Sequence, residues 1–385
     1  MSKLLEQINK GKKPHSIHEI TELKYGFGLP ERDREKGSIP VFGSSGIVGH
    51  HSETKVNKPA IIIGRKGNVG TLFYSETPSY PIDTVYFIDK PNEGFDLKYV
   101  YYLLNKINLP RYNGDSAVPG LSRDTVYSIE VETSDLPTQK KIAEILSAYD
   151  AKIENNNKEI KWLEELAQIT FNEWFVAFRF LGWDKFKFVD SEMGEIPEGW
   201  KVGHIKDLVR VESGFPFSSS IFNNFGKYKL VTIRNVQDGS FTPDCDNRIG
   251  ELPDKLPKHC LLGSGDILLS LTGNVGRVCL VNGENYVLNQ RVSVLIPIQE
   301  RDRAYTYFLF RKSDFQNHLI SISKGTAQLN LSPVETKELE MVVPDEEALE
   351  RYSEVAMPMY KKIVEINYEN QKLKQSRDQL LLKLI

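Results

Sequence analysis

The sequence predicts an α+β protein with two β-rich domains and two long helices that pair through a coiled-coil seam. Apolar residues recur at alternating steps of four and three over two stretches of roughly forty residues each. Short apolar strands bounded by Gly, Pro and Ser turns fill the remaining regions. The same landmarks appear twice in the same order, which indicates an internal duplication with pseudo-two-fold character.

The central stretch, residues 137–182, is predicted to form one long helix. Pro137 suits the first turn, where proline is tolerated, and the helix is expected to stop near Gly182. Asn156 occupies the seam, where polar residues more often fix register than add stability, although a solvated turn of helix is an equally good explanation. The apolar seam positions are Ile142, Leu146, Tyr149, Ile153, Ile160 and Leu163.

The partner helix is predicted at residues 345–385, where the same spacing returns with Asn370 on the seam. Each helix would run about 60 Å, so the pair is interpreted as a spacer between two other parts. Its seam positions include Tyr352, Met359, Ile363, Ile366, Leu373 and Leu380. An aromatic stripe near the end of the central helix is expected to pack against the second β-rich domain, with a partner-docking surface as the alternative; it comprises Phe171, Trp174, Phe175 and Phe178.

Composition limits the classes of function. The net charge of -3 offers no bulk attraction to nucleic acid, so any DNA contact must come from local basic patches. The three cysteines lack CxxC spacing, which argues against structural zinc and against a disulfide framework. No run approaches eighteen apolar residues and the start lacks a signal-peptide core, so we expect a cytoplasmic protein without membrane contact.

The duplication is visible in the letters. AIIIGRKGNVGTLFY (60–74) parallels DILLSLTGNVGRVCL (266–280), and a helix expected at 96–105 is matched by one at 305–315. These landmarks divide the chain into a β-rich domain at 1–136, the central helix at 137–182, a second β-rich domain at 183–344 and the last helix at 345–385.

The shared GNVG string is better explained as a hairpin turn than as a phosphate loop. A phosphate loop must open a helix, whereas an apolar strand follows GNVG on each occasion. A rigid turn can carry a basic side chain to a phosphate or to a guanine edge. The candidates at these turns are Arg65, Lys66 and Arg277.

Other polar loop residues suit base edges, because Arg pairs with guanine while Asn and Gln pair with adenine. A solvated loop position is the alternative interpretation for each of them. In the second domain the candidates are Arg234, Asn235, Asn289, Gln290 and Arg291. In the first domain they are Ser44, Ser45, His50, His51, Arg111, Tyr112 and Arg123.

Motifs for chemistry are missing. His50 and His51 would point to opposite faces of a strand and no Cys, Asp or Glu cluster completes a site, so we predict no metal. The sequence carries no glycine-rich methyl-donor turn, no Asn-Pro-Pro-aromatic or Asp-Pro-Pro-aromatic signature, no GxxxxGKS or GxxxxGKT loop and no convincing nuclease cluster. We therefore predict a protein without catalytic residues.

Four segments, in this order and partly duplicated, resemble the specificity subunits of type I restriction-modification systems. They are LPTQKKIAEILSAYDAKIE (136–154), IPEGWKV (196–202), LSLTGNVG (269–276) and GTAQLNLS (325–332). The resemblance implies two target recognition domains, each reading half of a split site in double-stranded DNA, separated by two antiparallel helices. The first half departs from the pattern, because it lacks the PEGW segment and has GKKPH (11–15) instead.

The resemblance also implies partners. Two methyltransferase subunits would be held on the DNA, with restriction subunits as an optional further partner. Those subunits would use S-adenosylmethionine, ATP and Mg, and this chain would bind no cofactor. Two alternatives from the residues stay open: a scaffold whose two β-rich domains bind protein, and a DNA-acting enzyme with an unrecognised active site.

Overall fold

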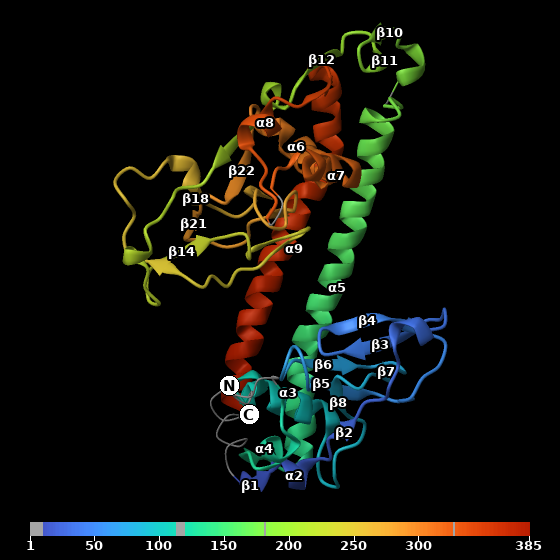
Figure 1. Ribbon diagram of the computed structural model, residues 1–385, viewed down its shortest axis with the longest axis vertical. Helices are drawn as coiled ribbons and strands as arrows, with labels where there is room; N and C mark the ends of the chain where they lie inside the picture. Colours follow the sequence, from blue (N-terminus) through green and yellow to red (C-terminus); the bar gives the residue numbers. More distant parts are fainter. Residues whose placement is uncertain (1–10, 113–119, 181, 326–327) are drawn as a thin grey trace. The chain divides into compact units, whose positions relative to one another are not determined.

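A computed structural model describes residues 11–112, 120–180, 182–325 and 328–385 (Figure 1). The chain divides into two compact units, residues 1–152 with 373–385 and residues 153–372. Each unit combines one β-rich region with parts of both long helices, as the α+β prediction requires. No helix in the described ranges is long and apolar enough to cross a membrane.

The two long helices are α5 (Leu136–Phe175) and α9 (Glu346–Leu384). α5 ends at Phe175, so the end expected near Gly182 was placed too late. Phe178 adopts a left-handed conformation with φ of 56°, which an α-helix cannot accommodate. In the second unit the helices run antiparallel, because Phe171 near the end of α5 contacts Tyr352 near the start of α9 at a ring separation of 6.0 Å.

The seam is apolar except at one polar level. All twelve apolar positions expected on the seam are buried or partly buried. Asn156 Nδ2 donates to Asn370 Oδ1 at 2.9 Å, and Asn370 Nδ2 donates to Asn157 Oδ1 at 2.9 Å. Asn156 and Asn370 are only 2% and 5% exposed, so the solvated-turn explanation does not hold for this pair. The paired amides instead fix which residues of α5 face which residues of α9.

In its described residues the first unit contains three sheets and three short helices (Figure 1), and its buried apolar side chains form two clusters. A four-stranded sheet has the order β2-β8-β5-β6, a three-stranded sheet the order β4-β3-β7, and β1 pairs with β9. The bounds are β1 (Lys13–Ser16), β2 (Lys24–Tyr25), β3 (Ile39–Gly43), β4 (Gly46–His51), β5 (Ala60–Gly64), β6 (Leu72–Ser75), β7 (Tyr80–Pro81), β8 (Val85–Ile88), β9 (Glu130–Thr133), α2 (Ile17–Ile20), α3 (Leu97–Ile107), α4 (Arg123–Tyr127), and the 3₁₀ turns η1 (Glu31–Asp33) and η2 (Leu109–Tyr112).

The second unit repeats this arrangement and adds strands. Its four-stranded sheets have the orders β13-β22-β19-β20 and β17-β14-β21-β18, while β12 pairs with β23, β10 with β11 and β15 with β16. The bounds are β10 (Phe188–Ser191), β11 (Gly194–Pro197), β12 (Lys201–His204), β13 (Val209–Ser213), β14 (Tyr228–Val231), β15 (Val236–Gln237), β16 (Ser240–Phe241), β17 (Arg248–Ile249), β18 (Leu261–Leu262), β19 (Ile267–Ser270), β20 (Val278–Leu280), β21 (Tyr286–Leu288), β22 (Val292–Pro297), β23 (Glu340–Val343), α6 (Arg303–Arg311), α7 (Ser313–Ile322) and α8 (Pro333–Lys337).

Helix packing in the second unit follows the aromatic stripe. Phe171 and Phe175 of α5 lie 5.2 Å and 4.8 Å from the ring of Tyr305 in α6, so the stripe packs against this β-rich region. The single helix expected at 305–315 is instead two helices, α6 and α7. Lys312 between them has extended backbone angles, φ of −64° and ψ of 127°, which interrupt the helix. The helix expected at 96–105 is present as α3.

The duplication extends to individual backbone hydrogen bonds. Gly64 N donates to Thr71 O at 2.8 Å in the first unit, and Ser270 N donates to Arg277 O at 2.9 Å in the second. Leu121 N donates to Arg65 O at 2.9 Å, and Leu331 N donates to Leu271 O at 2.8 Å. Both GNVG strings connect adjacent antiparallel strands, β5 to β6 and β19 to β20, as the hairpin interpretation requires.

Loss of the buried amide pair should destabilise the protein. Asn370→Ala leaves the amides of Asn156 and Asn157 without this partner, which should lower the free energy of unfolding by about 1–3 kcal/mol. Asn155→Ala is the control, because Asn155 is an exposed asparagine of α5 directly before Asn156, and its effect should stay within about 0.5 kcal/mol. Urea denaturation of the full chain measures both. Equal losses for the two variants would contradict a register role for the buried pair.

Candidate nucleic-acid interface

Two turns meet at one end of the first β-rich region. Ser44 and Ser45 form the β3–β4 turn, and this turn contacts the GNVG turn at residues 67–70. Thr71 Oγ1 donates to Ser44 O at 2.7 Å, and Asn68 Nδ2 donates to Ser45 Oγ at 3.0 Å. A Cβ on Gly70, whose φ is +77°, would lie 2.4 Å from Pro110 N, so only glycine fits against η2. The contacts hold both turns in fixed positions.

Two basic candidates from separate segments, Arg65 and Arg123, come together at Tyr25. Arg65 and Lys66 follow β5, and Arg123 begins α4. The guanidinium carbons of Arg65 and Arg123 each lie 5.2 Å from the centre of the Tyr25 ring. Lys66, the residue after Arg65, is exposed. Tyr25 was missed by the sequence analysis, because a single aromatic residue near a turn gives no sign of two arginines that approach it from elsewhere in the chain.

The remaining candidates of the first unit have different surroundings. His51 is 5% exposed, its Nδ1 accepts a hydrogen bond from Glu35 N at 2.9 Å, and its ring lies 5.5 Å from that of Tyr80. His50 is exposed on the other face of β4. Arg111 Nη2 donates to Tyr112 Oη at 2.9 Å just before residues 113–119, which lie outside the described ranges. His51 therefore supports the fold, whereas His50 is accessible.

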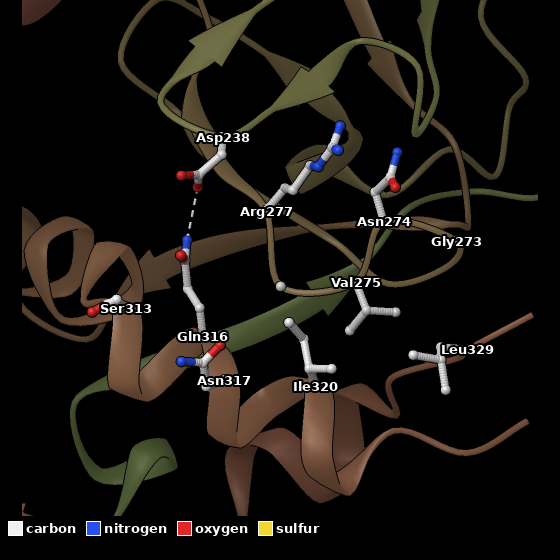
Figure 2. Close-up of a pocket in the computed structure, with 11 residues that line it drawn as sticks. Asp238, Gly273, Asn274, Val275, Arg277, Ser313, Gln316, Asn317, Ile320 and Leu329 are labelled. Carbon is white, nitrogen blue, oxygen red and sulfur yellow. Dashed lines mark hydrogen bonds between the residues drawn. The ribbon is translucent and has the colours of Figure 1, made fainter. Parts of the chain in front are cut away.

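The corresponding turn in the second unit borders a pocket (Figure 2). Arg277 and Asn274 point to one side of the turn, while Val275 lies on the other side with Ile320 and Leu329. Arg277 Nη1 donates to Oε1 of Gln237. The turn therefore presents polar groups on one face and rests on apolar side chains on the other. Thr326 and Ala327 of the GTAQLNLS segment lie outside the described residues.

The loop at residues 289–291 lies beside this turn. Leu271 N donates to Arg291 O at 3.1 Å. This bond holds the loop against Leu271, the residue that follows β19 and leads into the GNVG turn. Asn289 Oδ1 accepts a hydrogen bond from Arg291 N at 3.3 Å, so Asn289 shapes the loop. Gln290 and Arg291 are exposed and leave their side-chain donors and acceptors accessible.

Asn235 and Arg234 are occupied within the protein. Asn235 is 2% exposed; its Oδ1 accepts from Thr232 N at 2.9 Å, and its Nδ2 donates to the carbonyls of Thr242 and Asp244 at 2.9 and 2.8 Å. Its amide is therefore buried and bonded to the surrounding loop, which it organises. Arg234 Nη1 pairs with Asp246 at 2.5 Å on the exposed surface, where such pairs contribute little stability.

A partly buried ion network supports the Arg277 turn. Arg311 of α6 binds Asp238 at 2.5 Å and Glu164 of α5 at 3.4 Å, and Tyr307 Oη donates to Glu164 Oε1 at 2.6 Å. Burial alone would raise the pKa of Asp238, but the hydrogen bond and charge of Arg311, together with hydrogen bonds from Gln316 and the backbone of Val278, lower it. Asp238 adjoins Gln237, the acceptor for Arg277, so α5 is linked to the turn through consecutive contacts. Nothing in the sequence pattern marked Arg311.

The described parts of the chain contain no group of three His, Cys, Asp or Glu side chains that could hold a metal ion. The fold is thus two copies of one β-rich arrangement, each with a fixed turn that carries polar side chains, and two long antiparallel helices.

Comparison with known proteins identifies the family to which this combination of features belongs. The type I restriction modification DNA specificity domain matches residues 9–165 and 197–372. The chain therefore belongs to the family of type I restriction-modification specificity subunits, a non-catalytic family that recognises DNA and scaffolds the complex.

Relatives span most of the chain. It is 28% identical over 306 residues to the MjaIX specificity subunit of Methanocaldococcus jannaschii, covering 77% of this chain and 69% of that protein. It is 22% identical over 386 residues to the HindI specificity subunit of Haemophilus influenzae, covering 83% and 84%. The crystal structure of a type I S subunit from M. genitalium superposes with a TM-score of 0.59 over 98% of this chain and 96% of that one. At 15% identity this likeness supports the fold alone.

The different surroundings of Asn235 and Arg291 give a prediction. Asn235→Ala removes buried hydrogen bonds to the backbone of Thr232, Thr242 and Asp244 and should lower the free energy of unfolding by about 1–3 kcal/mol. Arg291→Ala removes an exposed side chain and should change the unfolding free energy by less than about 0.5 kcal/mol. Urea denaturation of both variants measures this. An unchanged stability for Asn235→Ala would mean that the loop does not depend on this amide.

Proposed function

We propose that the chain reads a bipartite site in double-stranded DNA, with one half-site contacted by each β-rich region. The observation that carries this proposal is a shared backbone frame with different side chains. Positions that are equivalent by their backbone hydrogen bonds hold Lys66 and Thr272, Thr71 and Arg277, and Thr84 and Arg291. A constant frame with variable polar groups at one edge suits two readers of different sequences.

The exposed groups fit base recognition in the second region. Arg291 and Gln290 are accessible on a loop held beside the GNVG turn. Arg binds guanine through two parallel hydrogen bonds in the major groove, and Gln binds adenine in the same way. Arg277 keeps one contact to Gln237, which orients its guanidinium and lowers the entropy lost on binding. These three residues are the proposed readers of one half-site.

The proposed DNA contacts of the first region are Ser44, Ser45, His50, Arg65, Lys66, Arg111, Tyr112 and Arg123. The proposed functional division of the chain is 1–136 and 183–344 for the two target recognition domains, with 137–182 and 345–385 as the spacer. α5 and α9 would then separate the readers and hold two methyltransferase subunits, and restriction subunits where the system cleaves. S-adenosylmethionine, ATP and Mg would act in those subunits.

A hybrid protein tests the proposal. Residues 201–343 include both β12 and β23, which pair with each other, so exchanging this segment for that of a relative keeps the pair intact. The hybrid should methylate sites in which one half has changed and the other is retained, because each region carries its own sheets and turns. Methylome sequencing of cells that carry the hybrid and the partner subunits measures this.

The reciprocal exchange of residues 13–133, which contains the β1–β9 pair, is the control. It should change the other half of the methylated sequence. A change in both halves from either exchange would contradict two independent readers, and an unchanged site would contradict reading by these regions.

A further inference from the structure

We infer that Tyr25, Arg65 and Arg123 form a binding site for a DNA phosphodiester group in the first unit, and that the second unit lacks an equivalent. The inference rests on the proposed function and deepens it. It assigns to one target recognition domain a contact with the DNA backbone that supplies affinity for any sequence. The three residues come from β2, from the end of β5 and from the start of α4.

The geometry of the site is set by stacking and by one hydrogen bond. The Tyr25 ring is 50% exposed and lies 5.2 Å from each guanidinium carbon, so both arginines share one aromatic platform. Arg65 also lies 5.8 Å from the Tyr86 ring, and its Nη2 donates to Asp83 O at 2.7 Å. Arg123 also lies 5.9 Å from the Tyr127 ring. These contacts orient the two guanidinium groups before any ligand binds.

The charge of the site is uncompensated. No carboxylate oxygen among the described residues comes within the 4.0 Å ion-pair distance of Arg65 or Arg123. By contrast, Arg303, Arg311 and Arg377 each pair with at least one carboxylate. The Nε of Arg65 is buried without a hydrogen-bond partner. Two like charges beside one ring repel each other, and an anion would remove this cost.

The duplication shows that the fold does not need this arrangement. Tyr25 pairs with Tyr86 as Ser213 pairs with Ser293, so Ser213 takes the place of Tyr25 in the second unit. Arg65 O and Leu271 O accept equivalent hydrogen bonds from Leu121 N and Leu331 N.

The third position follows from the helix caps. Arg123 follows the capping Ser122 of α4, as Pro333 follows the capping Ser332 of α8. The same backbone therefore forms with Ser213, Leu271 and Pro333 in place of the tyrosine and both arginines. The fold therefore does not require Tyr25, Arg65 and Arg123, and the two arginines repel each other. Binding of an anion explains why they are present.

A phosphodiester is the anion that best fits the surroundings. The planar guanidinium fork donates two parallel hydrogen bonds to phosphate oxygens. Lys66, which follows Arg65 directly in the chain, is exposed. Contacts to the backbone position a protein on DNA without reading sequence. An acidic surface of a partner subunit is the other anion that could bind here, and the experiment below separates the two.

The test measures the salt dependence of DNA binding by the full chain. The double variant Arg65→Gln/Arg123→Gln should weaken binding to the cognate duplex and to an unrelated duplex by the same factor. Because two phosphate contacts are lost, the slope of log K against log salt should become shallower by about 1.8. Arg179→Gln removes one positive charge of an arginine that pairs with Glu173, and its slope should match that of the wild type.

Two further variants separate stacking from folding. Tyr25→Phe keeps the ring and should retain the wild-type slope, whereas Tyr25→Ser, which introduces the residue of the second unit, should make the slope shallower while circular dichroism stays unchanged. A wild-type slope in the double arginine variant would overturn the phosphate site and leave the proposed function standing.

A partner contact gives a different result. If the double variant keeps the wild-type slope but no longer retains the methyltransferase subunit in co-purification, the anion belongs to that subunit and the phosphate site is wrong. If the wild-type chain shows no sequence preference with or without that subunit, the proposed function itself fails, whatever the slope.

Discussion

A buried pair of amides fixes the register of the two long helices. Asn156 and Asn370 bind each other at 2.9 Å within an otherwise apolar seam. A slip along the seam would place each amide against apolar side chains and leave its donors unpaired, at a cost of a few kcal/mol. The register therefore has one strongly favoured value, and every contact that α5 and α9 make with the second β-rich region depends on it.

Those contacts link the helices to the turn that carries Arg277. Glu164 of α5 reaches Tyr307 and Arg311 of α6, and Tyr360 of α9 donates to Gly265 O next to β19. Arg311 also pairs with Asp238, which is next in sequence to Gln237, the residue that accepts a hydrogen bond from Arg277. Contacts that begin at α5 and α9 therefore hold this turn in position. A polar edge held this firmly can bind a rigid duplex without a large loss of conformational entropy.

Features that depend on local sequence patterns could be predicted from the sequence. The two GNVG hairpins and the seam positions of the asparagines were predictable, because glycine-flanked turns and heptad positions are local patterns, whereas the burial of the asparagines was not. The helix expected at 305–315 is interrupted at Lys312. This break was not predictable, because a lysine gives no sign in the sequence of an extended backbone. Boundaries of this kind are decided by packing of α6 and α7 in the folded unit rather than by local preference.

The candidate site was predictable only as a set of residue types. Asn235 was chosen as a polar loop residue, but the structure uses both ends of its amide for backbone hydrogen bonds. His51 was chosen together with His50, and only burial of one strand face separates them. Tyr25 was overlooked because its partners, Arg65 and Arg123, are far apart in sequence. Which side chains remain free is a property of the folded surface, and composition cannot supply it.

The central claim is that one chain carries two readers of different sequence. Selection of bound duplexes from a random library by the full chain, assembled with its methyltransferase subunits, tests it most directly. We expect two constant blocks of bases separated by an unspecified gap of fixed length. A single continuous block, or a gap of variable length, would contradict two readers held at a set separation.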